Sequence, residues 1–230
     1  MVGNTASDKN NLDLASVAGT YEGTFPAADG SGIKTVLTIK ADRVTIRGLT
    51  LRGSGDSHDT IDGAIMAEGK ELLIENNVLE DVLFGISLHK TTDSIVRGNR
   101  IRSRPVDSAE RGDGMRLWYS TGNRIENNDI AQMRDLTVSN SPRNRFTGNT
   151  IHDSRRAFNF LFSHRSIVEG NLLDKNSTGV ISLNSEGMVI RNNRILHAMD
   201  ASGAGKAKRD LERLLRASSS WDDAGRPGQP

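Results

Sequence analysis

The sequence contains no cysteine, which excludes disulfide bonds and thiolate-held metal sites and leaves no thiol signal of a redox compartment. Aromatic residues make up only 4% of the chain, and no apolar run approaches the roughly 20 residues that a membrane-spanning helix needs. The formal net charge is +1, from 30 Lys and Arg against 29 Asp and Glu. This balance gives no general attraction to nucleic acid or to anionic lipid. We therefore predict no nucleic-acid partner and no membrane span.

The N-terminus, MVGNTASDKNN, also lacks the apolar stretch of a secretory signal peptide. From this feature alone, we expect a cytoplasmic protein, a mature form or a fragment that lacks its true start.

Glycine, in contrast, is abundant at 23 residues, and much of it falls in a repeat. Seven segments share an apolar residue, a polar residue, a Gly or Asn slot, usually an Asn, and then an aliphatic residue. Examples are VTIRGLTL from Val44 and SIVRGNRI from Ser94. The slots are Gly48, Asn76, Gly98, Asn127, Gly148, Gly170 and Asn192. Successive slots are 28, 22, 29, 21, 22 and 22 residues apart, and a fixed period of this size indicates a stacked repeat architecture.

A second, mostly small residue stands 13 positions before each slot from the second onward and opens another short alternating run. These residues are Gly63, Gly85, Gly114, Asp135, Ala157 and Gly179. The extra length of the two long repeats therefore falls in two insertions, around Ser54–Thr60 and Ser103–Asp113. Short strands of period two, separated by Gly or Asn, are typical of β-solenoid coils. We predict an all-β fold, a right-handed parallel β-helix of about seven coils of 21–29 residues.

The repeat also predicts what lies inside the coils. We expect Ile125 and Ile167 to face the interior, where apolar residues of successive coils form columns. An Asn follows most slots, at Asn77, Asn99, Asn128, Asn149, Asn171 and Asn193. We interpret these residues as a structural ladder, in which each Asn takes a left-handed conformation and hydrogen-bonds to the next coil.

The two ends of the chain depart from the repeat. We predict a flexible segment over residues 1–18, the β-helix over 19–205, an amphipathic helix over 206–217 and a disordered tail over 218–230. The helix would place Leu211, Leu214 and Leu215 on one face. Such a helix could cap the last coil and block an open sheet edge.

The first insertion contains Asp56, His58 and Asp59, followed by Asp62. A carboxylate beside an imidazole can supply the base and the acid that remove and replace a sugar proton. The sequence Asp-Ser-His-Asp resembles the Asp-Pro-His-Asp signature of alginate epimerases, with Ser57 in place of Pro. These three residues are the catalytic candidates if the chain is an enzyme, and a hydrogen-bonded turn is the alternative interpretation.

The second insertion adds Arg104, Arg111 and Asp113, and its repeat position would allow it to flank the same groove; a solvated loop is the alternative interpretation. Trp118 and Tyr119 follow it as an adjacent pair. On a strand one ring of such a pair would face inward and the other outward, where it could stack on a sugar or contact a partner protein.

Histidine and methionine provide the soft ligands that copper(I) prefers. His197 and Met199 lie two residues apart, which on a strand directs both side chains to one face. They are the candidate metal ligands, and copper(I) is the candidate cofactor.

Several stretches resemble the NosD family of periplasmic β-helix proteins. They include VLTIKADRVTIRGLTLRGSGDSHDTIDGAI, RGDGMRLWYSTGNRIENNDI and ILHAMDASGAG. The resemblance implies a periplasmic location beside an ABC transporter. It also implies receipt of copper from a lipoprotein chaperone and a role in assembling the copper–sulfur centre of nitrous oxide reductase.

Two functions therefore stand at this point. The first is a non-enzymatic accessory protein, similar to NosD, that presents a β-helix face to ABC transporter subunits and a copper chaperone. The alternative is a carbohydrate-binding or polysaccharide-modifying protein, such as a uronate epimerase or lyase. An outward groove lined by Asp, Arg and an aromatic residue would favour the second function.

Overall fold

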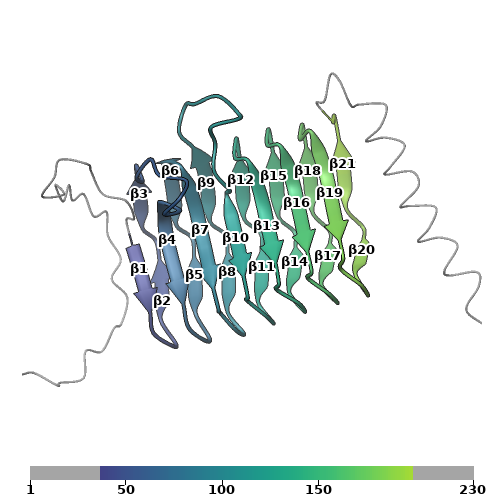
Figure 1. Cartoon of the computed structure of the whole chain (residues 1–230), viewed down its shortest axis with the longest axis horizontal. Helices are drawn as coiled ribbons and strands as arrows, with labels where there is room; N and C mark the ends of the chain where they lie inside the picture. The colour runs from purple at the N-terminus through teal and green to yellow at the C-terminus, as the bar shows by residue number, and fades with distance from the viewer. Residues whose placement is uncertain (1–36, 199–230) are drawn as a thin grey trace, which may run out of the picture.

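The computed structural model describes residues 37–198, which form 21 short strands in three parallel sheets (Figure 1). Each coil contributes one strand to each sheet in turn, and the three sheets enclose one apolar interior. The architecture is the predicted right-handed parallel β-helix of seven coils. No helix of the described residues is long and apolar enough to cross a membrane.

The strands of the three sheets have the following bounds. Sheet A contains β1 (Leu37–Lys40), β4 (Gly63–Glu68), β7 (Phe84–His89), β10 (Met115–Trp118), β13 (Asp135–Ser139), β16 (Arg156–Leu161) and β19 (Thr178–Leu183). Sheet B contains β2 (Thr45–Arg47), β5 (Leu73–Glu75), β8 (Ile95–Arg97), β11 (Arg124–Glu126), β14 (Arg145–Thr147), β17 (Ile167–Glu169) and β20 (Val189–Arg191). Sheet C contains β3 (Thr50–Arg52), β6 (Val78–Val82), β9 (Arg100–Ser103), β12 (Asp129–Ala131), β15 (Thr150–His152), β18 (Leu172–Asp174) and β21 (Arg194–Leu196).

The predicted segments 1–18, 206–217 and 218–230 lie outside the described residues, and so do both ends of the predicted β-helix region 19–205.

The interior column of sheet B comes from the middle residue of each strand. Ile125 is fully buried and pairs with Val96 and Phe146 of the neighbouring coils, as predicted. The prediction for Ile167 is wrong, because this residue opens β17 on the outward face and is partly exposed. Val168 faces inward instead. Side chains alternate along a strand, so an error of one residue moves a side chain to the opposite face.

The Asn ladder is present and closes the turn between sheets B and C. Asn99 Nδ2 donates to Asn128 Oδ1 at 2.9 Å, and Asn77 N donates to Asn99 Oδ1 at 3.0 Å. The left-handed conformation, however, belongs to the preceding slot residue. All seven slots have φ between 52° and 68°. Gly or Asn is favoured there because both tolerate positive φ, which leaves the next Asn free to bond along the stack.

Small residues at the start of sheet A have a packing cause. A Cβ on Gly85 would lie 2.7 Å from Ile101 Cγ2, and one on Gly114 would lie 2.6 Å from Ile130 Cγ2. Sheet A therefore begins so close to the inner residues of sheet C that a larger side chain would collide with them. The periodic small residue marks the corner between these two sheets.

Candidate functional site: the outward face of sheet A

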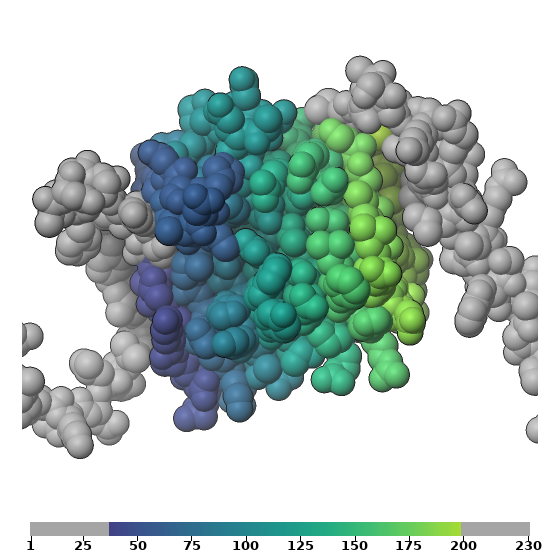
Figure 2. Space-filling model, in the orientation of Figure 1, coloured from purple at the N-terminus to yellow at the C-terminus, as the bar shows by residue number. Residues whose placement is uncertain are grey.

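The outward side chains of sheet A align in rows along the stack because parallel pairing keeps the coils in register. Figure 2 shows the stacked coils of this face as a succession of colours from purple to yellow. One row contains Ser87, Arg116 and Thr137. Ser87, Ser139 and Asn159 are nearly buried although they point away from the core. Larger side chains therefore cover these small polar groups. The edge where the strands begin and the edge where they end carry different side chains.

Both insertions stand at the edge where the strands of sheet A begin, because they follow β3 and β9 (Figure 1). Arg104 forms an ion pair with Asp56, and its Nη2 donates to the backbone oxygen of Ser54 at 2.6 Å. His58 Nε2 lies 3.0 Å from the backbone oxygen of Glu110. The structure therefore brings the two loops together, across the single short turn that separates β6 from β7.

The predicted catalytic residues are largely engaged within these loops. The charge of Asp56 faces Arg104, and the His58 ring meets Phe84 edge-on with centroids 5.4 Å apart. Asp59 is exposed. Asp62 is buried, and it accepts from Thr60 Oγ1 at 2.6 Å and from Ser57 N at 2.9 Å. Asp62 therefore holds the loop in shape, while His58 and Asp59 remain at its surface.

A cluster of charged side chains, the charged edge, lies along the beginnings of β10, β13 and β16. Its members are Asp113, Arg134, Asp135, Arg155 and Arg156. Arg155 donates to both oxygens of Asp135, at 2.9 Å from Nε and 2.6 Å from Nη2. Arg134 Nε donates to Asp113 Oδ1 at 3.1 Å. Both carboxylates are only 3% exposed, so Asp113 depends on Arg134, and Asp135 on Arg155 and Arg156, for compensation of their charges.

Burial is the largest influence on Asp113 and raises its pKa above the ordinary value. Arg134 opposes this shift in the pKa, and the nearby Asp135 adds to it. The hydrogen bond from Arg155 to Asp135 raises the pKa of the Arg155 guanidinium. Sequence reasoning named Asp113 but missed Asp135 and its arginines. The available signal was that Asp135 is the one charged residue among the small residues 13 positions before the slots.

Apolar side chains gather where the strands of sheet A end. This aromatic patch consists of Trp118, Tyr119, Leu161, Phe162 and Leu183. Tyr119, Phe162 and Leu183 are 55%, 51% and 52% exposed. The predicted inward and outward alternation of Trp118 and Tyr119 is wrong. Trp118 is the last strand residue and points outward beside His89 and Ser139, whereas Tyr119 has φ 52° and begins a turn.

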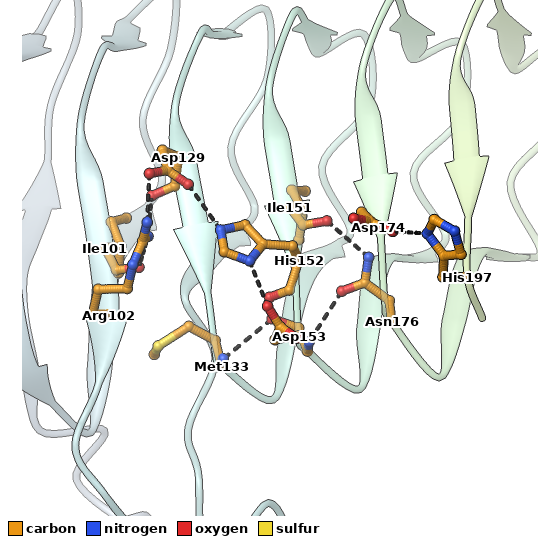
Figure 3. A network of polar contacts seen from close by, with 11 residues as sticks. Ile101, Arg102, Asp129, Met133, Ile151, His152, Asp153, Asp174, Asn176 and His197 are labelled. Carbon is orange, nitrogen blue, oxygen red and sulfur yellow. Dashed lines mark hydrogen bonds and ion pairs between the residues drawn. The ribbon is translucent and has the colours of Figure 1, made fainter. Parts of the chain in front are cut away.

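A separate polar network follows the outward face of sheet C (Figure 3). His152 lies between two carboxylates, with Nδ1 2.6 Å from Asp153 Oδ2 and Nε2 3.2 Å from Asp129 Oδ1. Arg102 Nη2 donates to the second oxygen of Asp129 at 2.5 Å. These contacts link three successive coils and use the hydrogen-bonding capacity of the imidazole.

His197, the predicted metal ligand, stands at the end of the same face (Figure 3). Its Nδ1 lies 2.8 Å from Asp174 Oδ1, and this hydrogen bond lowers the pKa of Asp174. Met199 lies outside the described residues. Between residues 37 and 198 no group of three or more His, Asp or Glu side chains is arranged to hold a metal ion. The described residues therefore offer copper the exposed ring of His197 but do not form a closed site.

Two family models match the sequence. The model described as periplasmic copper-binding protein (NosD) matches residues 101–210, and the NlpE N-terminal domain model matches residues 21–103. The second match runs through coils that stack directly on those of the first, so it marks no separate domain within the described residues.

Curated proteins with similar sequences are also named NosD. The chain is 32% identical over 111 residues to the probable ABC transporter binding protein NosD of Pseudomonas aeruginosa, an alignment that covers 46% of this chain and 26% of that protein. It is 31% identical over 134 residues to the protein of the same name from Stutzerimonas stutzeri, covering 51% and 31%. The chain is thus NosD-like, and the alignments span about a quarter to a third of these relatives.

Among solved structures, a double mutant of the periplasmic alginate epimerase AlgG aligns with a TM-score of 0.54. The alignment covers 70% of this chain and 44% of that one, at 18% sequence identity. At this identity the likeness establishes the right-handed parallel β-helix fold alone.

Proposed function

We propose that this chain is a non-enzymatic accessory protein of the bacterial periplasm that presents the outward face of sheet A to partner proteins. By its similarity to NosD, it would act with an ABC transporter and a copper chaperone in maturation of the copper site of nitrous oxide reductase. The name of the NosD family model supplies periplasmic copper binding, and the names of both relatives supply the ABC transporter. The copper chaperone and nitrous oxide reductase come from the resemblance to the NosD family and are part of the proposal.

The observation that carries the proposal is the arrangement of the ionisable groups on this face. Asp56 pairs with Arg104, Asp113 with Arg134, and Asp135 with Arg155. Carboxylates held in this way stabilise the loops and the sheet edge. An acid and a base on opposite sides of a substrate, as epimerisation requires, are not evident among residues 37–198. The face offers instead an exposed aromatic patch beside a polar surface, which suits protein contact.

Copper enters the proposal through His197 and Met199. His197 Nδ1 is occupied by Asp174, which leaves Nε2 as the ring nitrogen for a soft metal. A copper site would need Met199 and at least one further ligand from a partner or from residues outside 37–198. We therefore propose that any copper bound by this chain is held weakly and shared with a partner.

The proposal is tested in a denitrifying bacterium that lacks its own NosD. The chain, directed to the periplasm, is expected to restore nitrous oxide reduction and the visible absorption of the copper–sulfur centre. The Ile125→Asp variant provides a control in which the fold is disrupted. Normal periplasmic levels of the folded parent, without any recovery of the copper–sulfur centre, would contradict the proposal.

A polysaccharide-modifying function is the second candidate, favoured by one observation. The loop that carries His58 and Asp59 stands beside the outward face of sheet A, close to Arg104 of the second insertion. An arginine there could neutralise a uronate carboxylate. The side chain that would supply the second proton is missing from this arrangement, since Tyr119 lies at the opposite edge of the sheet.

The second candidate is tested by proton exchange at C5 of polyuronates in deuterated water. We expect no exchange by the parent above the background rate. Exchange by the parent that is abolished in Asp59→Asn, with an unchanged melting temperature, would replace the accessory role by an enzymatic one.

A further inference from the structure

The turn that follows sheet A places one residue of each of coils three to seven in a left-handed conformation. The column contains Lys90, Tyr119, Asn140, Phe162 and Asn184, with φ between 49° and 52°. Asn occupies two of these positions, in keeping with its tolerance of positive φ. Aromatic residues are unfavourable in this conformation, and here both are more than half exposed. Neither local backbone preference nor core packing explains why aromatic residues occupy positions 119 and 162.

These two rings belong to one continuous surface. Leu161 precedes Phe162 and pairs directly with Leu183 of the next coil, while Trp118 precedes Tyr119 and pairs with Ser139. Neighbouring coils lie about 4.8 Å apart, so only the small Ser139 and Asn140 separate the two aromatic positions. The Trp118 and Tyr119 rings meet edge-on, with centroids 5.7 Å apart. The aromatic patch therefore spans coils four to seven.

Positive charge predominates at the centre of the patch, while the coil-seven segment that carries Leu183 contains one carboxylate, Glu186. The three segments that form its centre, residues 116–122, 137–143 and 159–165, contain three arginines and no acidic residue. Arg116 stacks on Trp118, with its guanidinium carbon 4.8 Å from the ring centroid. Neither Arg116, Arg143 nor Arg165 forms an ion pair with another described residue. Ten other described arginines form ion pairs, as in the charged edge, whereas five do not: Arg43, Arg47, Arg100, Arg111 and Arg194.

From this combination we propose that the aromatic patch docks an acidic, apolar segment of a partner protein, in which carboxylates alternate with aliphatic or aromatic side chains. The inference rests on the proposed accessory role and identifies the chemistry of its partner. Carboxylates would meet Arg116, Arg143 and Arg165, which gives electrostatic attraction and orientation. Apolar side chains would cover Tyr119, Phe162 and Leu183. The aliphatic side chains of the patch favour a polypeptide partner. An anionic glycan has no apolar side chains with which to cover Leu161 and Leu183.

The experiment compares the parent with a Tyr119→Asn, Phe162→Asn double variant. Asn already occupies the same turn in coils five and seven, so this variant is expected to fold and to melt at or above the temperature of the parent. A phage-displayed library of random 12-residue peptides is selected on each protein. Peptides recovered by the parent alone should be enriched in Asp and Glu together with Leu, Ile, Phe or Trp. Their dissociation constants should rise at least tenfold on the double variant.

Two matched controls separate the patch from the rest of the surface. Arg143→Gln with Arg165→Gln should weaken the same peptides and reduce their salt dependence, whereas Arg47→Gln on sheet B should not. Ile167→Asn, an outward apolar change on sheet B, should also leave binding unchanged. Selection of the same peptides by parent and double variant, or enrichment of basic peptides, would overturn the proposal. Patch-dependent binding of an alginate hexamer without any peptide preference would overturn it in favour of a glycan.

These outcomes are independent of enzyme maturation. A chain that restores the copper–sulfur centre but binds peptides without regard to Tyr119 and Phe162 would refute the docking surface alone. Patch-dependent binding of acidic peptides by a chain that restores nothing would refute the accessory role in nitrous oxide reductase maturation alone.

Discussion

Asp135 and Arg155 form a two-point ion pair between adjacent coils, in which the carboxylate is almost fully buried and the guanidinium is half exposed. Removing the arginine would leave the buried carboxylate with only the longer contact from Arg156 Nη1, at 3.4 Å. Breaking a buried pair by removing one partner costs about 3–5 kcal/mol, and the remaining contact reduces this loss. Removing the carboxylate leaves an arginine that can still reach water. We therefore predict that Arg155→Ala lowers the free energy of unfolding by several kcal/mol more than Arg124→Ala, a control at an exposed pair. Urea denaturation measures the difference, and equal losses would show that the pair is screened like a surface contact.

The raised pKa of Asp113 predicts a pH dependence of opposite sign to that of most carboxylates. Burial favours the protonated form, so the folded state holds this proton to a higher pH than the unfolded state does. Stability from this group is therefore complete below the unfolded pKa, about 3.9, and declines as pH rises through the folded pKa.

The Asp113→Asn variant should lack this decline while keeping an acceptor for Arg134. Thermal melts of parent and variant between pH 3.5 and 7 measure the effect, and the difference in melting temperature should move in favour of the variant as pH rises. A constant difference across this range would show that folding does not raise the pKa of Asp113.

Two isoleucines in sheet B provide a direct test of the coil register. Ile125→Asp would place an unpaired charge in the interior, at a cost of several kcal/mol out of the roughly 5–15 kcal/mol that stabilise an ordinary domain. Ile167→Asp would place the same charge on the outward face and should cost much less. Circular dichroism melts should separate the two variants by well over ten degrees. A lower melting temperature for Ile167→Asp than for Ile125→Asp would mean that the register of β11 and β17 is displaced by one residue.

For copper, titration with copper(I) under reducing conditions should show weak binding that His197→Ala with Met199→Ala reduces further. The physical reason is that one exposed imidazole within residues 37–198 cannot complete a coordination shell. Sub-micromolar binding that survives the double substitution would show that the metal is held elsewhere.

The last coil leads to a prediction about the segment beyond it. Ile190 continues the interior column of sheet B but is 39% exposed, whereas its counterparts in the six preceding coils are at most 4% exposed. We propose that the amphipathic segment 206–217 covers this end. Leu211→Asp with Leu214→Asp should then lower the melting temperature, while Arg213→Asp, on the opposite face of the expected helix, should not. Equal melting temperatures for both variants would exclude the cap.

The repeat made the fold predictable because spacing alone determines how the coils stack. The Asn after most slots and the mostly small residue 13 positions before them both proved to make contacts between neighbouring coils or sheets. The orientation of Ile167 was not predictable in the same way, because SIVEGN contains two adjacent aliphatic residues and either could satisfy the alternation. The pairing of Asp135 with Arg155 escaped prediction because it depends on a turn that brings two polar segments together. Tyr119 was misplaced because its strand ends one residue earlier than its sequence suggests.

The uniform step of 22 residues from Gly148 to Asn192 makes these coils interchangeable modules. Because each coil contacts only its neighbours, a unit can be duplicated or deleted while the interior columns remain aligned. Each such event would shift the features on either side of it by about 4.8 Å. Gene duplication, or a protein engineer, could therefore adjust the spacing between two surface determinants in fixed increments without redesigning the core.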